Sequence, residues 1–198
     1  MTERNRRDGV MDRMQARANT SHLDEGFTLI ELMVVLLILA ILLAIAIPTF
    51  LGVTQSANDR AAQSNLHTAW VNADSIFQAN AQSFPAASTL AASLTVAEPA
   101  LSFVSGTVNT SSNTPQTSVG VAVSNDGQAV MLAEMAKGTG TCWYQADIEI
   151  AQTGVTGVAT ATTAAGAWYG KQTGQSSCTP GFAGGLTDVT WQQNGFPG

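Results

Sequence analysis

Charged residues are scarce in this chain of 198 residues, and they are unevenly distributed. Lys, Arg, Asp and Glu make up 11% of the sequence, less than half of the share that is usual in soluble domains. Beyond residue 26, only Arg60, Lys137 and Lys171 oppose nine acidic residues, so the whole net charge of −6 lies in this part. Three scattered cations cannot neutralise a run of phosphates, and we therefore expect no direct nucleic-acid binding.

Cysteine and histidine are almost absent, which leaves few ways to build a metal site. The two cysteines, Cys142 and Cys178, cannot form a structural zinc site without histidine, and the histidines are His22 and His67. A single disulfide is therefore favoured, provided that this part of the chain lies outside the cytoplasm. Closing a loop of this length would stabilise the fold by about 4 kcal/mol.

Residue combinations that are typical of catalysis are also missing. No paired carboxylates, phosphate-binding glycine loop, metal-spaced His/Cys set or Ser-His-Asp arrangement stands out in the sequence. A Cys–His nucleophile would have to combine a cysteine with His67, which we interpret as a residue on the face of a helix. We predict that the protein is not an enzyme and uses no metal or cofactor.

A long hydrophobic run is present near the N-terminus. Leu32–Ile47 contains 16 consecutive apolar residues. A helix from Phe27 to Phe50 would be about 36 Å long, enough to cross the hydrocarbon core of a membrane. Five arginines precede the run, so the positive-inside rule keeps residues 1–26 in the cytoplasm and exports the rest. We predict a single-pass membrane protein whose head lies outside the cell.

Glu31 is an unusual residue for such a segment, because an acidic side chain in a membrane is costly and is a functional candidate by default. No Lys or Arg occurs between Arg17 and Arg60, so no side chain of the segment can neutralise it. A chain cut between Gly26 and Phe27 would carry a free amine four residues from Glu31. The amine of the same chain, or that of a neighbouring chain, could then pair with the carboxylate.

The segment GFTLIELMVV, residues 26–35, followed by the apolar run and Pro48, resembles the N-terminus of type IV prepilins. The resemblance extends over about residues 24–72, although a leader of 26 residues is long for the class that begins with Phe. It implies that a prepilin peptidase cuts after Gly26 and methylates the new Phe27 amine. It also implies that identical chains assemble into a helical filament, in which Glu31 pairs with the Phe27 amine of a neighbouring subunit. The partners that it implies for assembly are a pilus assembly platform and minor pilins.

Two other interpretations of the hydrophobic segment leave Glu31 without a role. A secretory signal could be cut after Ala46, because Ala44-Ile45-Ala46 has the small-x-small form of a cleavage site. An uncut signal anchor is the other alternative.

Beyond the membrane segment, a helix is expected to continue to Phe84, before Pro85. Pro48 predicts a kink, and Gly52 weakens the same region. A hydrophobic stripe of helical spacing follows, formed by Ala62, Leu66, Trp70, Ala73 and Phe77.

Residues 85–118 are rich in Ser and Thr and are predicted to form a long exposed loop, in which Asn109 fits an N-glycosylation acceptor. Strands are predicted over 119–123 and 129–134, joined by a turn at residues 125–127, and over 141–150. Alternation puts Cys142 on the buried face of the third strand. Shorter strands are expected near 155–160 and 167–170, and the C-terminal aromatic residues are interpreted as core rather than as a carbohydrate-binding surface.

These patterns predict an α+β fold, in which a long N-terminal helix packs on a C-terminal antiparallel sheet. The predicted parts are a leader (1–26), a transmembrane or filament-core helix (27–50), an amphipathic half-helix (51–84), a loop (85–118) and a disulfide-bounded head (119–198).

The function that the resemblance implies is that of a structural subunit, a major pilin, of a type IV pilus for adhesion, motility or DNA uptake. The filament would be extracellular after assembly. Alternatives are a pseudopilin of a type II secretion system, a minor pilin, and a membrane-anchored extracellular binding module that forms no filament.

Overall fold

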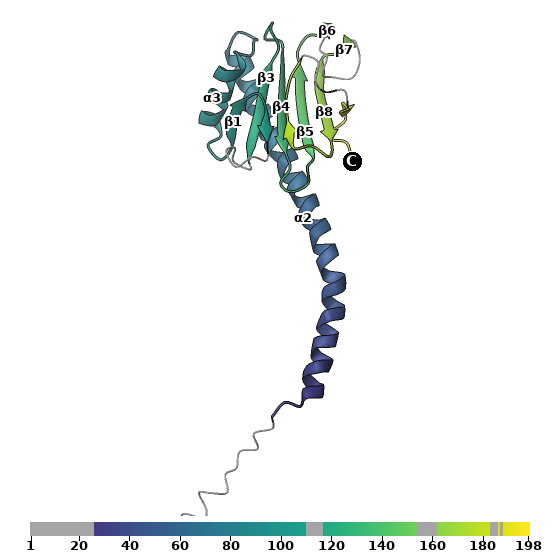
Figure 1. The fold of residues 1–198 in the computed structure, drawn as a ribbon. Helices are drawn as coiled ribbons and strands as arrows, with labels where there is room; N and C mark the ends of the chain where they lie inside the picture. Colours follow the sequence, from purple (N-terminus) through teal and green to yellow (C-terminus); the bar gives the residue numbers. More distant parts are fainter. Residues whose placement is uncertain (1–25, 110–116, 154–161, 183–185, 187) are drawn as a thin grey trace, which may run out of the picture. The chain divides into compact units, whose positions relative to one another are not determined.

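The computed structural model describes residues 26–109, 117–153, 162–182, 186 and 188–198 (Figure 1). The chain divides into two compact units, Met1–Thr49 and Phe50–Gly198. Helix α2, Leu29–Ala79, begins in the first unit and ends in the second. The second unit also holds a mixed sheet of six strands, so the predicted α+β class, with its long N-terminal helix and C-terminal sheet, is confirmed.

The apolar run forms the helical part of the first unit. Its residues from Leu32 to Ile47 are all exposed, and no described residue of this unit is buried. Pro48 lies inside α2, where it lacks the amide that would bond the carbonyl of Ala44. The Thr49 hydroxyl donates to the carbonyls of Ile45 and Ala46, at 3.1 and 2.9 Å. The kink at Pro48 stays a prediction.

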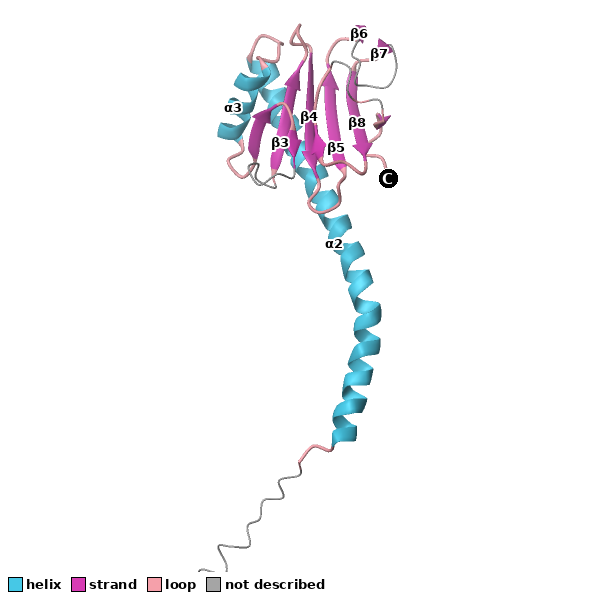
Figure 2. Cartoon of the chain, viewed as in Figure 1, coloured by secondary structure: helices cyan, strands magenta, loops and turns pink. Residues whose placement is uncertain are grey.

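The main sheet of the second unit has the order β1-β3-β4-β5-β8-β10 (Figure 2). Its strands are Ser102–Ser105, Ser118–Val123, Ala129–Met135, Cys142–Ile148, Gly166–Gln172 and Thr190–Gln192. β1 runs parallel to β3, whereas every other pair of neighbouring strands in this sheet is antiparallel. The sheet is therefore mixed, whereas a wholly antiparallel sheet was predicted. Two small sheets pair β2 (Val108–Asn109) with β9 (Ser177–Cys178) and β6 (Gln152–Thr153) with β7 (Thr162–Thr163).

The predicted turn between β3 and β4 is present. The Ser124 hydroxyl donates to Asp126 Oδ1 at 2.6 Å, and the amide of Gly127 donates to the carbonyl of Ser124. Gly127 has a φ of 70°, and a Cβ atom there would collide with the Ser83 hydroxyl. Only glycine fits this position, because it combines a left-handed backbone with close packing.

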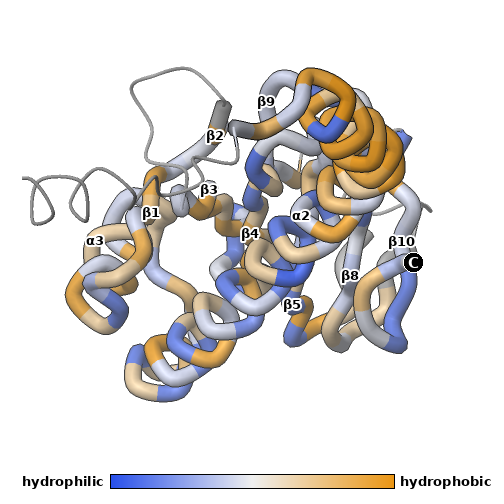
Figure 3. The backbone as a smooth tube through the Cα atoms, turned by 90° about the horizontal axis from the view of Figure 1, so that it is seen from below, coloured by the Kyte–Doolittle hydropathy of each residue, from blue (hydrophilic) through white to orange (hydrophobic). Residues whose placement is uncertain are grey.

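Both faces of the sheet are covered. The predicted stripe of α2 packs on one face with Val119, Val130 and Leu132; its Ala62, Leu66, Ala73 and Phe77 are buried and Trp70 is partly buried. The opposite face packs with Val108, Leu186, Val189 and the disulfide. In Figure 3, α2 is hydrophobic over the successive turns of its apolar run and mixed in the turns near β4 and β5. All seven residues of β5 are therefore buried, and not only the face that carries Cys142.

The long loop predicted over 85–118 is not what the structure has there. Helix α3 (Ala87–Ala97) occupies its first part, and β1 and β2 follow it. Leu90, Ala91 and Leu94 of α3 are buried, and their spacing places them on one face of the helix. Because the segment is rich in Ala and Leu, its helix propensity outweighs the Ser and Thr content that suggested a loop.

Helix α2 ends at Ala79, five residues before the predicted stop. Ala81 and Gln82 adopt positive φ angles of 55° and 59°, and the amide of Gln82 bonds to the carbonyl of Phe77. A left-handed residue just after a helix is a common way to end it. The strand expected near 155–160 falls outside the described residues, whereas the one expected near 167–170 is β8.

Candidate functional site

The start of α2 brings together three of the residues singled out in the sequence. Gly26, Phe27 and Thr28 precede the first turn, and Glu31 lies within it. The Phe27 side chain is 82% exposed. Among the described residues, a Cβ atom added to Gly26 would meet nothing within 4 Å, so their packing does not require glycine there.

Thr28 and Glu31 form a reciprocal cap at the N-terminus of α2. The Thr28 backbone amide donates to Glu31 Oε2 at 2.9 Å, and the Thr28 hydroxyl donates to the same oxygen at 2.7 Å. The Glu31 amide in turn donates to Thr28 Oγ1 at 3.3 Å. This is the geometry of a capping box, in which a Thr and a Glu three residues later satisfy each other's backbone amides. Within the described residues, Glu31 Oε1 accepts no hydrogen bond.

The helix that follows presents apolar side chains on all sides. By length and composition, α2 is the one helix of the described chain that is long and apolar enough to cross a membrane. Between residues 26 and 58 its single charged residue is Glu31. An open hollow on its surface is lined by Phe27, Ile30, Glu31, Val34 and Val35, so the carboxylate lies among apolar groups.

A model of the prokaryotic N-terminal methylation motif matches residues 22–47. This motif is the class III signal peptide of type IV pilins and pseudopilins. The match includes Gly26, Phe27 and Glu31, and it ends just before Pro48. Searches of curated proteins and of solved structures found no match.

The match covers 26 of the 198 residues, so it relates this segment, and not the head, to type IV pilins and pseudopilins. In type IV pilins and pseudopilins, such a motif implies processing by a prepilin peptidase and assembly into pili. Together with the apolar helix, the motif fits a membrane-anchored pilin. The cleavage position and the pairing of Glu31 remain predictions.

The predicted disulfide between Cys142 and Cys178 is present, with the two Cα atoms 5.5 Å apart. It connects β5 of the main sheet with β9, and both cysteines are fully buried. Because β9 pairs with β2, the bridge fixes a strand pair against the face of the sheet opposite α2. Asn109, the candidate glycosylation residue, lies at the end of β2, and its modification stays a prediction.

The C-terminal aromatic residues pack against each other, in agreement with the core interpretation. Phe196 makes edge-on contacts with Trp143 and Tyr169, at centroid distances of 5.7 and 4.9 Å. Lys171 Nζ lies 5.1 Å from the centre of the Trp143 ring. Trp191 contacts Tyr144, and it covers Gly170, where a Cβ atom would come within 3.0 Å of the Trp191 ring.

Three side-chain hydrogen bonds join α2 to the sheet, and sequence reasoning missed all of them. Asn65 donates to Glu134 Oε1 at 2.9 Å. The indole of Trp70 donates to Asp147 Oδ2 at 2.7 Å, and the indole of Trp143 donates to Asp59 Oδ1 at 3.1 Å. The partners are 69 to 84 residues apart in sequence, so no local spacing pattern could have indicated them.

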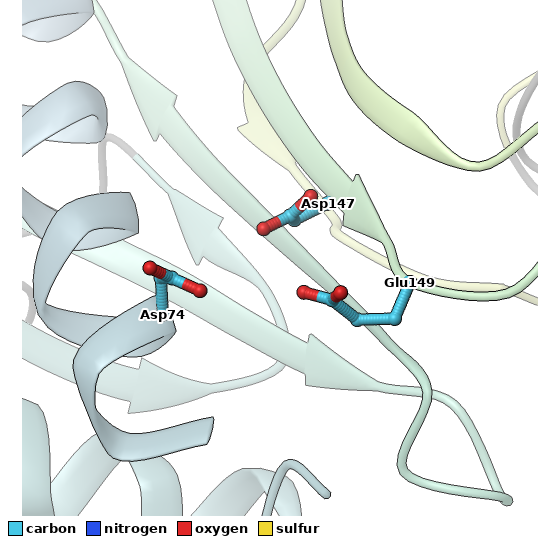
Figure 4. A group of neighbouring side chains, drawn as sticks. All are labelled: Asp74, Asp147 and Glu149. Atoms are coloured by element: carbon cyan, nitrogen blue, oxygen red, sulfur yellow. The ribbon is translucent and has the colours of Figure 1, made fainter. Parts of the chain in front are cut away.

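A cluster of three carboxylates lies beside the Trp70–Asp147 bond. Asp74, Asp147 and Glu149 point toward one another (Figure 4), with their oxygen atoms within 4.8 Å. Burial raises the pKa of Asp147 and of Glu149, and the neighbouring carboxylates raise both further. Carboxylate oxygens are the ligands that hard divalent cations prefer. Acidic residues alone do not define a metal site, however, and we assign none.

His67 is exposed on α2 and stacks on Trp70, with the ring centres 5.4 Å apart. This agrees with its interpretation as a residue of the helix face.

Proposed function

We propose that this chain is a structural subunit, the major pilin, of a type IV pilus and has no catalytic role. The observation that carries the proposal is the match of residues 22–47 to the methylation motif. The exposed apolar part of α2 and the isolated Glu31 support it, because a filament core made of such helices would bury both. Adhesion, motility and DNA uptake are the roles that such a filament would serve.

Processing would hydrolyse the peptide bond between Gly26 and Phe27. Water adds across this bond, so residues 1–26 leave with a new carboxylate and Phe27 becomes an amino terminus, which then receives a methyl group from a methyl donor. The exposed, non-helical backbone of Gly26 and Phe27 supports this step, because a peptidase needs an extended and accessible segment. Since the packing of the described residues does not require glycine at position 26, the requirement is attributed to the peptidase cleft.

Assembly would use the two oxygens of Glu31 differently. Oε2 is occupied by Thr28 of the same chain, which leaves Oε1 open to the Phe27 amine of a neighbouring subunit. In a low-dielectric core only one stagger of the helices would neutralise both charges, so the pair would set the register. Van der Waals packing between the apolar helices would replace contacts with lipid and supply the driving force.

The head would form the surface of the fibre. Its sheet, its disulfide and the C-terminal aromatic contacts give it a core of its own, independent of the apolar helix. We propose Asn109 as a glycosylation position on this surface, since it begins an Asn-Thr-Ser acceptor sequence.

The experiment that tests the proposal is intact-mass measurement and N-terminal sequencing of the protein in sheared surface material. We expect an abundant species that starts at methylated Phe27 and has both cysteines oxidised. A chain that starts at Met1 and is confined to membranes would instead support a membrane-anchored binding module.

Two further outcomes would replace the major-pilin proposal. A soluble species starting at Ile47 would identify the segment as a secretory signal. Correct processing at Phe27 with only traces of the protein in sheared filaments would favour a pseudopilin or a minor pilin.

A further inference from the structure

A buried carboxyl group lies between α2 and the sheet of the head. Glu134 of β4 is only 3% exposed. Its Oε1 accepts the hydrogen bond from Asn65 of α2, whereas its Oε2 is buried and has no hydrogen-bond partner among the described residues. A carboxyl group in this position favours its neutral form, because an ion would leave water for a site that offers one amide.

Among the described residues, the surroundings of Glu134 offer no compensating cation. In the sheet it pairs with Val119 of β3 and with Trp143 of β5. The charged groups packed on Trp143 are Asp59 of α2, which accepts its indole hydrogen, and Lys171 of β8, which lies over its ring. Within the described chain, neither Lys171 nor any other cation forms an ion pair with Glu134.

The other polar groups of this interface are no better placed to stabilise a charge. On the same face of β5, Gln145 is fully buried, and neither polar atom of its side chain has a partner in the described structure. The acidic cluster around Asp147 lies toward the opposite end of the β4–β5 pair, where Asp147 is paired with Val130. A negative charge on Glu134 would therefore be added to an interface whose buried polar atoms are already incompletely hydrogen-bonded.

We propose that Glu134 is a pH-sensitive latch that holds the part of α2 within the head, residues 50–79, against the sheet. The protonated side chain accepts the hydrogen bond from Asn65 without placing a charge in the interface, and the latch is closed. Ionisation places an unpaired carboxylate in the interface, and this part of α2 then opens more often than the sheet does. The latch is a property of the head and does not depend on the proposed role in a pilus.

The direction of the effect follows from burial. Burial raises the pKa of Glu134 to about 8, while the Asn65 hydrogen bond opposes the shift. The folded chain thus keeps a proton that the unfolded chain releases near its ordinary pKa of 4.5. The stabilisation is fully present below the pKa that Glu134 has in the unfolded chain. It is lost as pH rises through the pKa that Glu134 has in the folded chain. Between pH 6.5 and 8.5 we expect the closed state to lose about 25-fold in its equilibrium constant.

The test is amide hydrogen exchange of the full-length chain in detergent micelles between pH 6.5 and 8.5, corrected for the intrinsic pH dependence of exchange. In the wild type, protection of the amides in residues 55–79 should fall about 25-fold more than that of β4 and β5. In Glu134→Gln, which keeps an acceptor for Asn65 but cannot ionise, this extra loss should disappear. The control Glu98→Gln makes the same chemical change at the C-cap of α3 and should behave as the wild type does.

A second variant keeps the test decisive if Glu134→Gln folds poorly. Asn65→Ala removes the group that favours the ionised form, so the pH at which α2 loses protection should move upward. The proposal is overturned if α2 and the sheet lose protection in parallel, if Glu134→Gln keeps the extra loss, or if Asn65→Ala moves the transition downward.

Discussion

At the scale of the residue, Glu31 has a local role as part of a helix cap, and we propose an intermolecular role for the same side chain. A Glu three residues after Thr28 is part of a capping box, and such a cap would give α2 a defined first turn even in a single chain. The same carboxylate is the single charge between residues 26 and 58. Removal of the Glu31 carboxylate would therefore remove the helix cap and the charge together. A useful variant must remove the charge and keep the cap.

Glu31→Gln separates them, because the Gln carbonyl can still accept the Thr28 amide hydrogen while the charge is gone. We expect normal cleavage at the Gly26–Phe27 bond, an intact first turn, and at least tenfold fewer filaments in sheared material. Glu31→Ala should also be cleaved normally, and it should lose the cap as well as the filaments.

Cleavage is read from the N-terminal sequence and assembly from filament yield. Glu98→Gln in the head is the matched control and should assemble normally. Normal filaments from Glu31→Gln, combined with loss in Glu31→Ala, would assign Glu31 to helix capping alone and contradict the proposed charge pairing.

At the scale of the secondary-structure element, the contact between α2 and the sheet includes repulsion as well as attraction. The Trp70–Asp147 hydrogen bond stabilises the contact, but Asp74 and Glu149 crowd the same carboxylate. Because the pKa values of Asp147 and Glu149 are raised on folding, the stability that they contribute is present at low pH and decreases as pH rises.

Asp74→Asn should relieve this repulsion and raise the stability of the head. The substitution keeps the Trp70–Asp147 bond, and the Asn carbonyl can still accept the hydrogen bond from Gln78. At pH 8 we expect a gain of about 1 kcal/mol in the free energy of unfolding, the size of a partly screened interaction at this distance. At pH 5 the gain should be smaller. Thermal unfolding at both pH values measures it, and a loss of stability at pH 8 would contradict the explanation.

Sequence patterns predicted those elements whose periodicity is strong. The apolar run, the stripe of α2 from Ala62 to Phe77, the hairpin turn at Gly127 and the third strand were all predicted close to their positions. Each depends on local chemistry, namely helical spacing, a glycine turn or alternation along a strand.

The parts that were missed depend on tertiary contacts or on competing local preferences. α3 was hidden by a Ser- and Thr-rich composition, and the parallel pairing of β1 with β3 is a tertiary contact that no local pattern indicates. Glu134 looked like an ordinary strand residue, and its burial and its hydrogen bond to Asn65 of α2 are tertiary features. α2 starts at Leu29, two residues after the predicted start at Phe27.

At the scale of the whole molecule, the two units are stabilised by different means. The described residues of the first unit bury nothing within the chain, so this unit needs lipid or other helices around it. The second unit has one hydrophobic cluster on each face of its sheet and a disulfide within the second cluster. Damage to the head should therefore leave the membrane and packing properties of the apolar helix unchanged.

Replacement of both Cys142 and Cys178 by alanine tests this independence. The bridge spans a sequence separation of 36, so its removal should cost about 4 kcal/mol in the free energy of unfolding by the loop-closure argument. All four tryptophans lie in the second unit, at positions 70, 143, 168 and 191, so their fluorescence reports the unfolding of the head alone. Denaturant unfolding of the full-length chain in micelles should give a lower midpoint, while processing at Phe27 and membrane insertion stay normal. Failure of processing in this variant would show that the head and the N-terminal segment are coupled, contrary to the expectation from two separate cores.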